Sequence, residues 1–145
     1  MPTALTVETF AGLLLSIALG AIVGIEREKA HRPAGLRTHM LVSLGSCLFT
    51  IVSINFSAQP AQVAGGIVTG IGFIGAGTIW SEKDKVKGIT TAASLWATAA
   101  IGLTTGLGDF LLAITVTMLV LIILVSKYGI ARLHVENRDH TNTTT

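Results

Sequence analysis

The Lys and Arg residues of this chain gather in three short patches, and long uncharged apolar runs separate these patches. All ten basic residues lie within positions 27–37, 83–87 and 127–138. No Lys, Arg, Asp or Glu occurs at positions 38–81, 89–108 or 110–126. A helix needs about 20 predominantly apolar residues to cross the hydrocarbon core of a bilayer. The pattern therefore predicts an integral membrane protein.

The composition supports this class. Half of the 145 residues are apolar, 12% are charged and the mean hydropathy is +0.70, whereas soluble domains carry about 25% charged residues. The basic residues border apolar runs, so the net charge of +2 indicates anchoring at an anionic membrane surface, and no nucleic-acid partner is expected. Residues 1–7 carry no Lys or Arg, which favours a retained first helix over a cleaved signal peptide.

Five apolar segments are predicted to be transmembrane helices. They are residues 7–25, 38–57, 62–80, 89–107 and 110–126. Basic residues collect in cytoplasmic loops, and here they all fall in the first and third connections and in the tail. The basic patches that flank the last two segments require an even number of crossings between them.

The expected fold is therefore all-α: a polytopic helix bundle with five transmembrane helices, the N-terminus outside and the C-terminus cytoplasmic. Residues 1–126 are expected to form one membrane domain. Residues 127–145 are expected to form a short cytoplasmic tail that is partly disordered.

Small residues predict how these helices pack, because helices in lipid associate by close backbone approach at small side chains. The segment 62–80 is so rich in glycine that we expect it to lie centrally, and the bulky segment 110–126 to be peripheral. The predicted packing positions are Gly12, Ser16, Gly20 and Gly24 in the first segment, Gly66, Gly70 and Gly72 in the third, and Gly102 and Gly106 in the fourth.

Two groups of polar residues are candidate functional sites. The first is the junction at the inner ends of the first two segments: Glu26, Arg27, Arg37, Thr38 and His39. Glu26 and Arg27 lie at the interface, where they can pair with Arg37 or with lipid phosphates. A charged topology anchor explains the same residues and is the more common case.

The second candidate is a polar face on the third and fourth segments. It consists of Thr69, Thr78, Thr90, Thr91, Ser94 and Thr98, with Trp96 expected to be packed nearby. Hydroxyl groups in membrane helices usually bond back to their own carbonyls or to a neighbouring helix. A polar pathway is the less common alternative.

No catalytic or cofactor site is expected. Residues 70–75 spell G-x-G-x-x-G, but they lie within an apolar run instead of between a strand and a helix, which excludes a dinucleotide site. The histidines at positions 31, 39, 134 and 140 lack metal-ligand spacing. No Asp or Glu occupies mid-membrane, where ion-coupled transporters place ionisable groups. The chain is therefore expected not to be an enzyme.

Three motifs in order resemble the N-terminal membrane domain of the MgtC/SapB family. They are Gly20-x-x-x-Gly24-Ile25-Glu26-Arg27-Glu28 with Ala34-Gly35-Leu36-Arg37-Thr38-His39, then Gly70-Ile71-Gly72-Phe73-Ile74-Gly75-Ala76-Gly77, then Val86-x-Gly88-Ile89-Thr90-Thr91-Ala92-Ala93-x-Leu95-Trp96. The resemblance implies a multi-pass protein of the bacterial inner membrane that is linked to adaptation to low magnesium. It further implies the short form without a soluble C-terminal domain, and the F-type ATP synthase as a partner.

Two functions remain open at this point. The leading hypothesis is a non-enzymatic regulator that works through helix–helix contacts, as a homo-oligomer in the lipid bilayer and with other membrane proteins. The alternative is an oligomeric pathway for Mg²⁺ or another cation, lined by the third and fourth segments.

Overall fold

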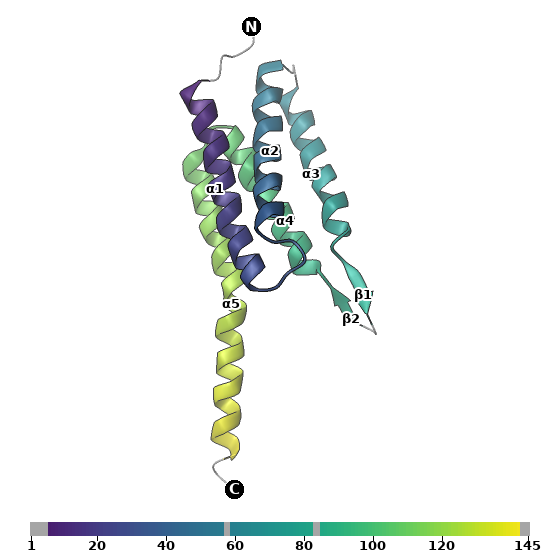
Figure 1. Ribbon diagram of the computed structural model, residues 1–145, viewed down its shortest axis with the longest axis vertical. Helices are drawn as coiled ribbons and strands as arrows, with labels where there is room; N and C mark the ends of the chain where they lie inside the picture. Colours follow the sequence, from purple (N-terminus) through teal and green to yellow (C-terminus); the bar gives the residue numbers. More distant parts are fainter. Residues whose placement is uncertain (1–5, 57–58, 83–84, 143–145) are drawn as a thin grey trace.

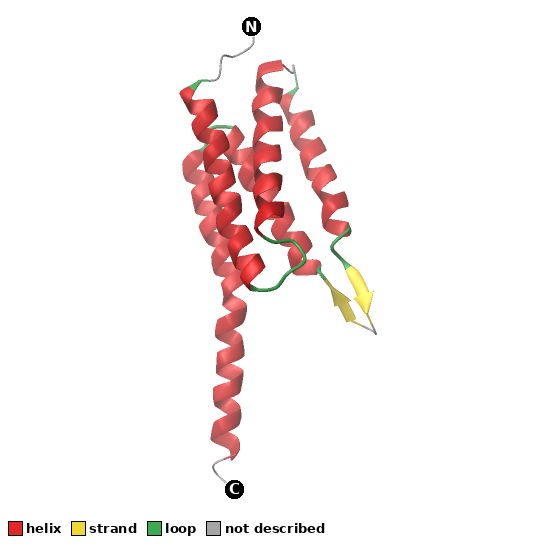
Figure 2. Ribbon diagram, in the orientation of Figure 1, coloured by secondary structure: helices red, strands yellow, loops and turns green. Residues whose placement is uncertain are grey.

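The computed structural model describes residues 6–56, 59–82 and 85–142, and within them it has five helices and one short hairpin (Figures 1 and 2). The helices are α1 (Val7–Lys29), α2 (Leu36–Phe56), α3 (Pro60–Ala76), α4 (Ile89–Gly106) and α5 (Phe110–Asn142), and the strands are β1 (Trp80–Glu82) and β2 (Lys85–Lys87). The predicted all-α class is confirmed. The hairpin was not predicted.

The hairpin replaces the last turn that the sequence suggested for the third helix. Trp80 was expected to end that helix, but it pairs with Lys87 across an antiparallel ladder. Glycines at the end of α3 lower the helix propensity, and the β-forming side chains that follow favour strands. Lys87 and Glu82 form an ion pair across the ladder.

A single glycine turns the chain from the hairpin into α4. Gly88 has a positive φ of 91°, and a Cβ at this position would overlap the carbonyl of Thr78. Only glycine meets both conditions without strain. The start of α4 is therefore specified by Gly88 and not by a side-chain cap.

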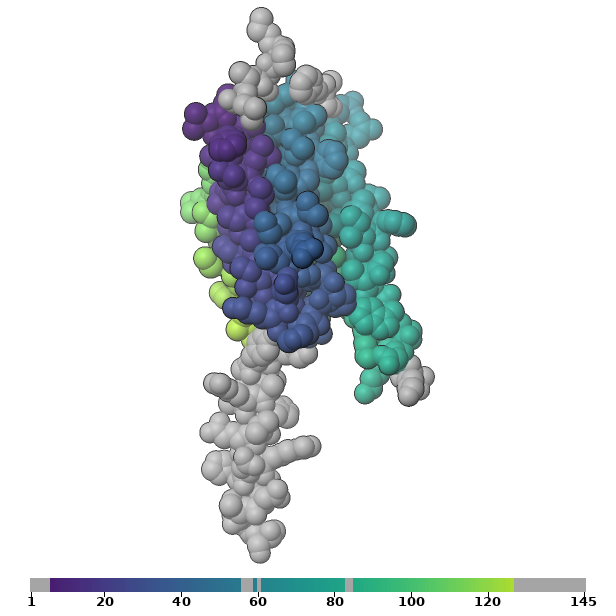
Figure 3. Space-filling view, in the orientation of Figure 1, coloured from purple at the N-terminus to yellow at the C-terminus, as the bar shows by residue number. Residues whose placement is uncertain are grey.

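α4 is the central helix of the bundle. It contacts α1, α2, α3 and α5, whereas α3 makes its main contacts with α2 and α4 only. Figures 1 and 3 show α3 along one edge. The prediction that segment 62–80 lies centrally is therefore wrong. Ala, Thr and Gly cover several faces of α4, so four neighbouring helices can approach it closely.

The buried apolar side chains form two clusters on different faces of α4. One contains Leu19, Val23, Ile101, Ala113 and Leu124, and the other contains Ala34, Ile71, Leu95 and Ala99. α4 contributes to both clusters, which explains how one helix holds the bundle together.

Two helices among the described residues have the length and hydropathy to cross a membrane: Val7–Lys29 in α1 and Leu36–Asn55 in α2. Shorter apolar helices cover Ala61–Ala76 and Phe110–Ser126. α5 itself continues to Asn142, beyond the predicted end at Ser126. Residues 143–145 of the predicted tail lie outside the described residues, and the partial disorder expected of the tail stays a prediction.

Candidate functional site

Glycines on both sides bring α1 and α4 against the backbone of α2. A Cβ added at Gly20 of α1 would lie 2.7 Å from the carbonyl oxygen of His39. A Cβ at Gly106 of α4 would lie 2.7 Å from the carbonyl oxygen of Cys47, and one at Gly102 would overlap the carbonyl of Ser43. The backbone of α2 is therefore held between two helices with no room for a side chain at these contacts.

The other predicted packing residues divide into two groups. Gly12, Ser16 and Gly24 are buried on α1, and a Cβ at Gly24 would lie 2.7 Å from the Cα of Leu36. By contrast, a Cβ at Gly66, Gly70 or Gly72 of α3 would meet nothing within 4 Å. The expectation that these three glycines pack against another helix of the same chain is wrong, because α3 lies at the edge.

His39 joins the two predicted polar groups into one buried site. Its imidazole is fully buried, with Nδ1 2.9 Å from the carbonyl oxygen of Gly35 and Nε2 3.1 Å from Oγ of Ser94. Because a carbonyl oxygen only accepts, Nδ1 carries the proton and Nε2 is the acceptor in neutral imidazole. The Ser94 hydroxyl also lies 2.8 Å from the carbonyl oxygen of Thr91, so its single proton is shared between two acceptors.

Glu26 and Arg27 are close enough to this histidine to interact with it electrostatically. Arg27 is only 3% exposed, and its Nε pairs with the Glu26 carboxylate. Neither Arg27 Nη1 nor Glu26 Oε1 has a hydrogen-bond partner among the described residues. The C-terminal end of α1 thus holds a buried, incompletely satisfied ion pair.

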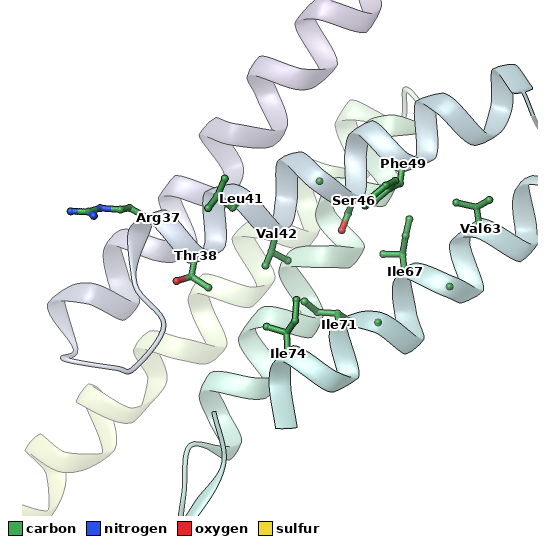
Figure 4. Close-up of a pocket in the computed structure, with 13 residues that line it drawn as sticks. Arg37, Thr38, Leu41, Val42, Ser46, Phe49, Val63, Ile67, Ile71 and Ile74 are labelled. Carbon is green, nitrogen blue, oxygen red and sulfur yellow. The ribbon is translucent and has the colours of Figure 1, made fainter. Parts of the chain in front are cut away.

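Arg37 and Thr38, which were expected in this junction, lie on another side of α2. Neither Glu26 nor Arg27 pairs with Arg37, so that expected pairing is wrong. Positions 37 and 39 are about 200° apart around a helix, and His39 faces α4. Arg37 and Thr38 instead lie at one end of a groove between α2 and α3 (Figure 4).

The predicted polar face does not form one continuous surface. Thr91, Ser94 and Thr98 are buried, and Thr98 donates back to the carbonyl of Ser94 at 2.8 Å. Of the remaining members, Thr69, Thr90 and Trp96 are exposed, and Thr78 is half-buried. Trp96 is 54% exposed, so its expected packing is wrong.

α2 carries a further row of polar residues that the sequence analysis did not predict. After His39, toward the C-terminal end of α2, four hydroxyl side chains are buried along one face: Ser43, Ser46, Thr50 and Ser53. Their alternating spacing of three and four residues matches one face of a helix, so the signal was present. Two of them bond back within the helix, Thr50 to the carbonyl of Ser46 at 2.8 Å and Ser53 to that of Thr50 at 2.9 Å, while Ser43 Oγ has no partner among the described residues.

The contact between His39 and Ser94 predicts an energetic coupling between α2 and α4. In a double-mutant cycle of His39→Phe and Ser94→Ala, we expect a coupling of about 0.6 kcal/mol, the average for hydrogen bonds between membrane helices. Reversible unfolding in mixed micelles measures it. The matched cycle of His39→Phe with the exposed Thr69→Ala should give no coupling. Equal coupling energies in both cycles would exclude a direct hydrogen bond between His39 and Ser94.

Comparison with known proteins supports the resemblance drawn from the motifs. The model of the MgtC family matches residues 13–133. Protein MgtC of Salmonella typhimurium is 46% identical over 110 residues, which cover 75% of this chain and 48% of that protein. An uncharacterised protein of Synechocystis sp. is 44% identical over 117 residues, which cover 79% of this chain and 50% of that protein.

A third relative is the protein named "Putative magnesium transporter YhiD" of Escherichia coli, 43% identical over 122 residues, which cover 77% of this chain and 56% of that protein. The chain thus spans about half the length of the curated relatives that it matches. No solved structure matches it. The match over residues 13–133 and these identities show that the chain belongs to the MgtC family.

Proposed function

We propose that this chain is a multi-pass protein of the bacterial inner membrane that regulates other membrane proteins through helix–helix contacts when magnesium is scarce. In this proposal it crosses the bilayer five times, with its N-terminus outside, and is not an enzyme. The name of one relative, "Putative magnesium transporter YhiD", connects the family with magnesium.

The arrangement of the basic residues supports this orientation. The α1–α2 loop, the hairpin and the C-terminal end of α5 lie at the same end of the bundle (Figure 1). The described basic residues, at positions 27–37, 85–87 and 127–138, lie in these segments or directly beside them. Cytoplasmic segments of membrane proteins are enriched in Lys and Arg, so this end corresponds to the cytoplasmic side.

The observation that carries the regulatory role is a row of small residues on the outer face of α3. Gly65, Thr69, Gly72 and Ala76 recur at intervals of four, three and four residues, which places them on one side of the helix. All four are exposed, and a Cβ at either glycine would meet nothing within 4 Å. Small residues at this spacing let a second helix backbone approach closely. We call this row the outer face of α3.

The bonding of the polar residues favours this role over a cation pathway. The hydroxyls of Ser94, Thr98 and Thr105 on α4 are buried and donate to carbonyls of their own helix. They pack inside the bundle instead of lining an open route along it. A cation pathway would have to form between copies of the chain.

Self-association through the outer face of α3 is testable with a matched pair of variants. For the double variant Gly65→Leu and Gly72→Leu, we expect the association constant to fall about tenfold, equivalent to 1.4 kcal/mol, because two large side chains keep the backbones apart. Energy transfer between labelled copies in liposomes at increasing lipid dilution measures it.

The control is the double variant Gly66→Leu and Gly70→Leu on the side of α3 that lines the groove with α2, which should associate normally. All four positions have open space for a side chain, so the bundle should fold in both variants. If the outer-face variant associates as well as the unchanged chain, this face is not the contact.

Reconstituted vesicles that enclose a fluorescent Mg²⁺ indicator separate the regulator from the transport alternative. We expect Mg²⁺ to enter them no faster than it enters protein-free vesicles. Sustained entry that scales with the amount of protein would replace the regulator by a cation pathway. Cross-linked capture from native membranes then tests the F-type ATP synthase as the partner that the family resemblance implies.

A further inference from the structure

The groove between α2 and α3 has the size of a small-molecule site. Its volume is about 740 Å³, within the range of about 300–1,000 Å³ that is typical of ligand pockets. Apolar side chains of both helices form its walls, among them Val42 and Phe49 of α2 and Ile67 and Ile71 of α3 (Figure 4). We call it the α2–α3 groove.

The length of the α2–α3 groove matches one leaflet of a bilayer. Arg37 lies at one end and Phe49 near the other. The twelve residue steps between them rise about 18 Å along a helix at 1.5 Å per residue. Half of the hydrocarbon core is about 15 Å thick, so a chain lying in the groove would extend from the membrane surface to near the midplane.

Among the residues that line the groove, the polar side chains are Arg37 and Thr38 at the cytoplasmic end and Ser46 part-way along it. Figure 4 shows Arg37 and Thr38 at the cytoplasmic end, with the guanidinium and the hydroxyl directed away from the apolar walls. Arg37 is exposed and makes no ion pair with any described residue. A guanidinium binds phosphate through two parallel N–H donors, and the cytoplasmic leaflet is rich in anionic lipids.

Glu28 decides which groups at this end are available to an anion. Its carboxylate accepts from the backbone N–H of Leu36 at 2.7 Å, so this first N–H of α2 is already occupied. We therefore expect an anion at this end to be held mainly by the side chains of Arg37 and Thr38.

We propose that the α2–α3 groove binds an anionic phospholipid of the cytoplasmic leaflet, with one acyl chain between the two helices and the phosphate on Arg37 and Thr38. Large side chains on both helices, among them Phe49 and Ile74, line the groove, and they favour a flexible acyl chain over the close approach of another helix backbone. The site depends on the proposed membrane orientation, but it does not depend on the regulatory role.

Native mass spectrometry of the full chain, released from detergent with two lipids of identical acyl chains, tests the headgroup. We expect phosphatidylglycerol to be retained about fivefold more than phosphatidylcholine, the effect of one cation near an anionic surface. Arg37→Gln should abolish this preference, and Arg37→Lys and the remote Lys85→Gln should keep it. Equal retention of the two lipids by the unchanged chain would overturn the assignment.

The same pairs of glycine variants test where the acyl chain lies. Gly66 and Gly70 line the groove, whereas Gly65 and Gly72 do not. We expect Gly66→Leu with Gly70→Leu to lower lipid retention about tenfold, and Gly65→Leu with Gly72→Leu to leave it unchanged. Unchanged retention in the groove variant overturns the proposal.

Energy transfer between copies separates this proposal from the regulatory one. If the groove variant loses self-association, the groove is a protein interface and the lipid assignment fails, while a helix-contact function stands. If lipid retention behaves as expected and the outer-face variant still associates, the proposed contact on α3 fails and the lipid site stands.

Discussion

Replacing Gly102 by Ala is expected to prevent most of the protein from assembling into its bundle. A Cβ at this position would overlap the backbone carbonyl of Ser43, and a backbone cannot move aside as a flexible side chain can. Overpacking of this kind costs about 3 kcal/mol or more. α2 cannot shift to relieve the overlap, because Gly20 of α1 contacts it from the other side.

The loss can be measured as the fraction of monodisperse protein in size-exclusion chromatography and as the midpoint of thermal unfolding. Gly72→Ala is the matched control, since its Cβ would enter open space. Alanine raises helix propensity at both positions, so only the packing differs. If Gly102→Ala unfolds at the temperature of the Gly72→Ala variant, α4 and α2 do not lie in backbone contact.

Removing Arg27 should destabilise the fold by about 3–5 kcal/mol, because it leaves the carboxylate of Glu26 in a buried place without its counter-charge. Arg27→Met keeps a long apolar side chain and removes only the charge. Equilibrium unfolding in mixed micelles gives the change in free energy. The exposed Arg37→Met should change it by less than about 0.5 kcal/mol.

A second substitution distinguishes a lost ion pair from lost packing. The double variant Glu26→Gln and Arg27→Met removes both charges, and buried ion pairs replaced by neutral groups often regain the lost stability. We therefore expect it to be more stable than Arg27→Met alone. If it is less stable, the effect of Arg27 comes from its packing.

The sequence was sufficient to predict where the helices lie along the chain, but not which helices pack against one another. Uncharged apolar runs and the charges between them predicted α1, α2 and α4 to within four residues at each end. Hydropathy does not report which helix is central, because that depends on which faces meet. Glycine content pointed to α3, yet in the structure the glycines of α1 and α4 make the close contacts.

The candidate site was likewise predicted in its residues but not in their arrangement. Glu26, Arg27 and His39 were chosen as one group and Thr91 and Ser94 as another, and the structure brings these five residues together. Arg37 and Thr38 were grouped with His39 because they adjoin it in sequence. A helix separates consecutive side chains by about 100°, so neighbours in the chain belong here to different sites.

The position of α3 at the edge has a consequence for how this bundle opens. α3 makes its main contacts with two helices, whereas α4 contacts four, and the hairpin joins α3 to α4 through Gly88. The least costly partial opening of a fold releases the element with the fewest packed neighbours. Backbone amides of α3 should therefore exchange with deuterium before those of α4, and the side of the bundle that this hinged movement uncovers is the face of α2 that carries Val42, Ser46 and Phe49.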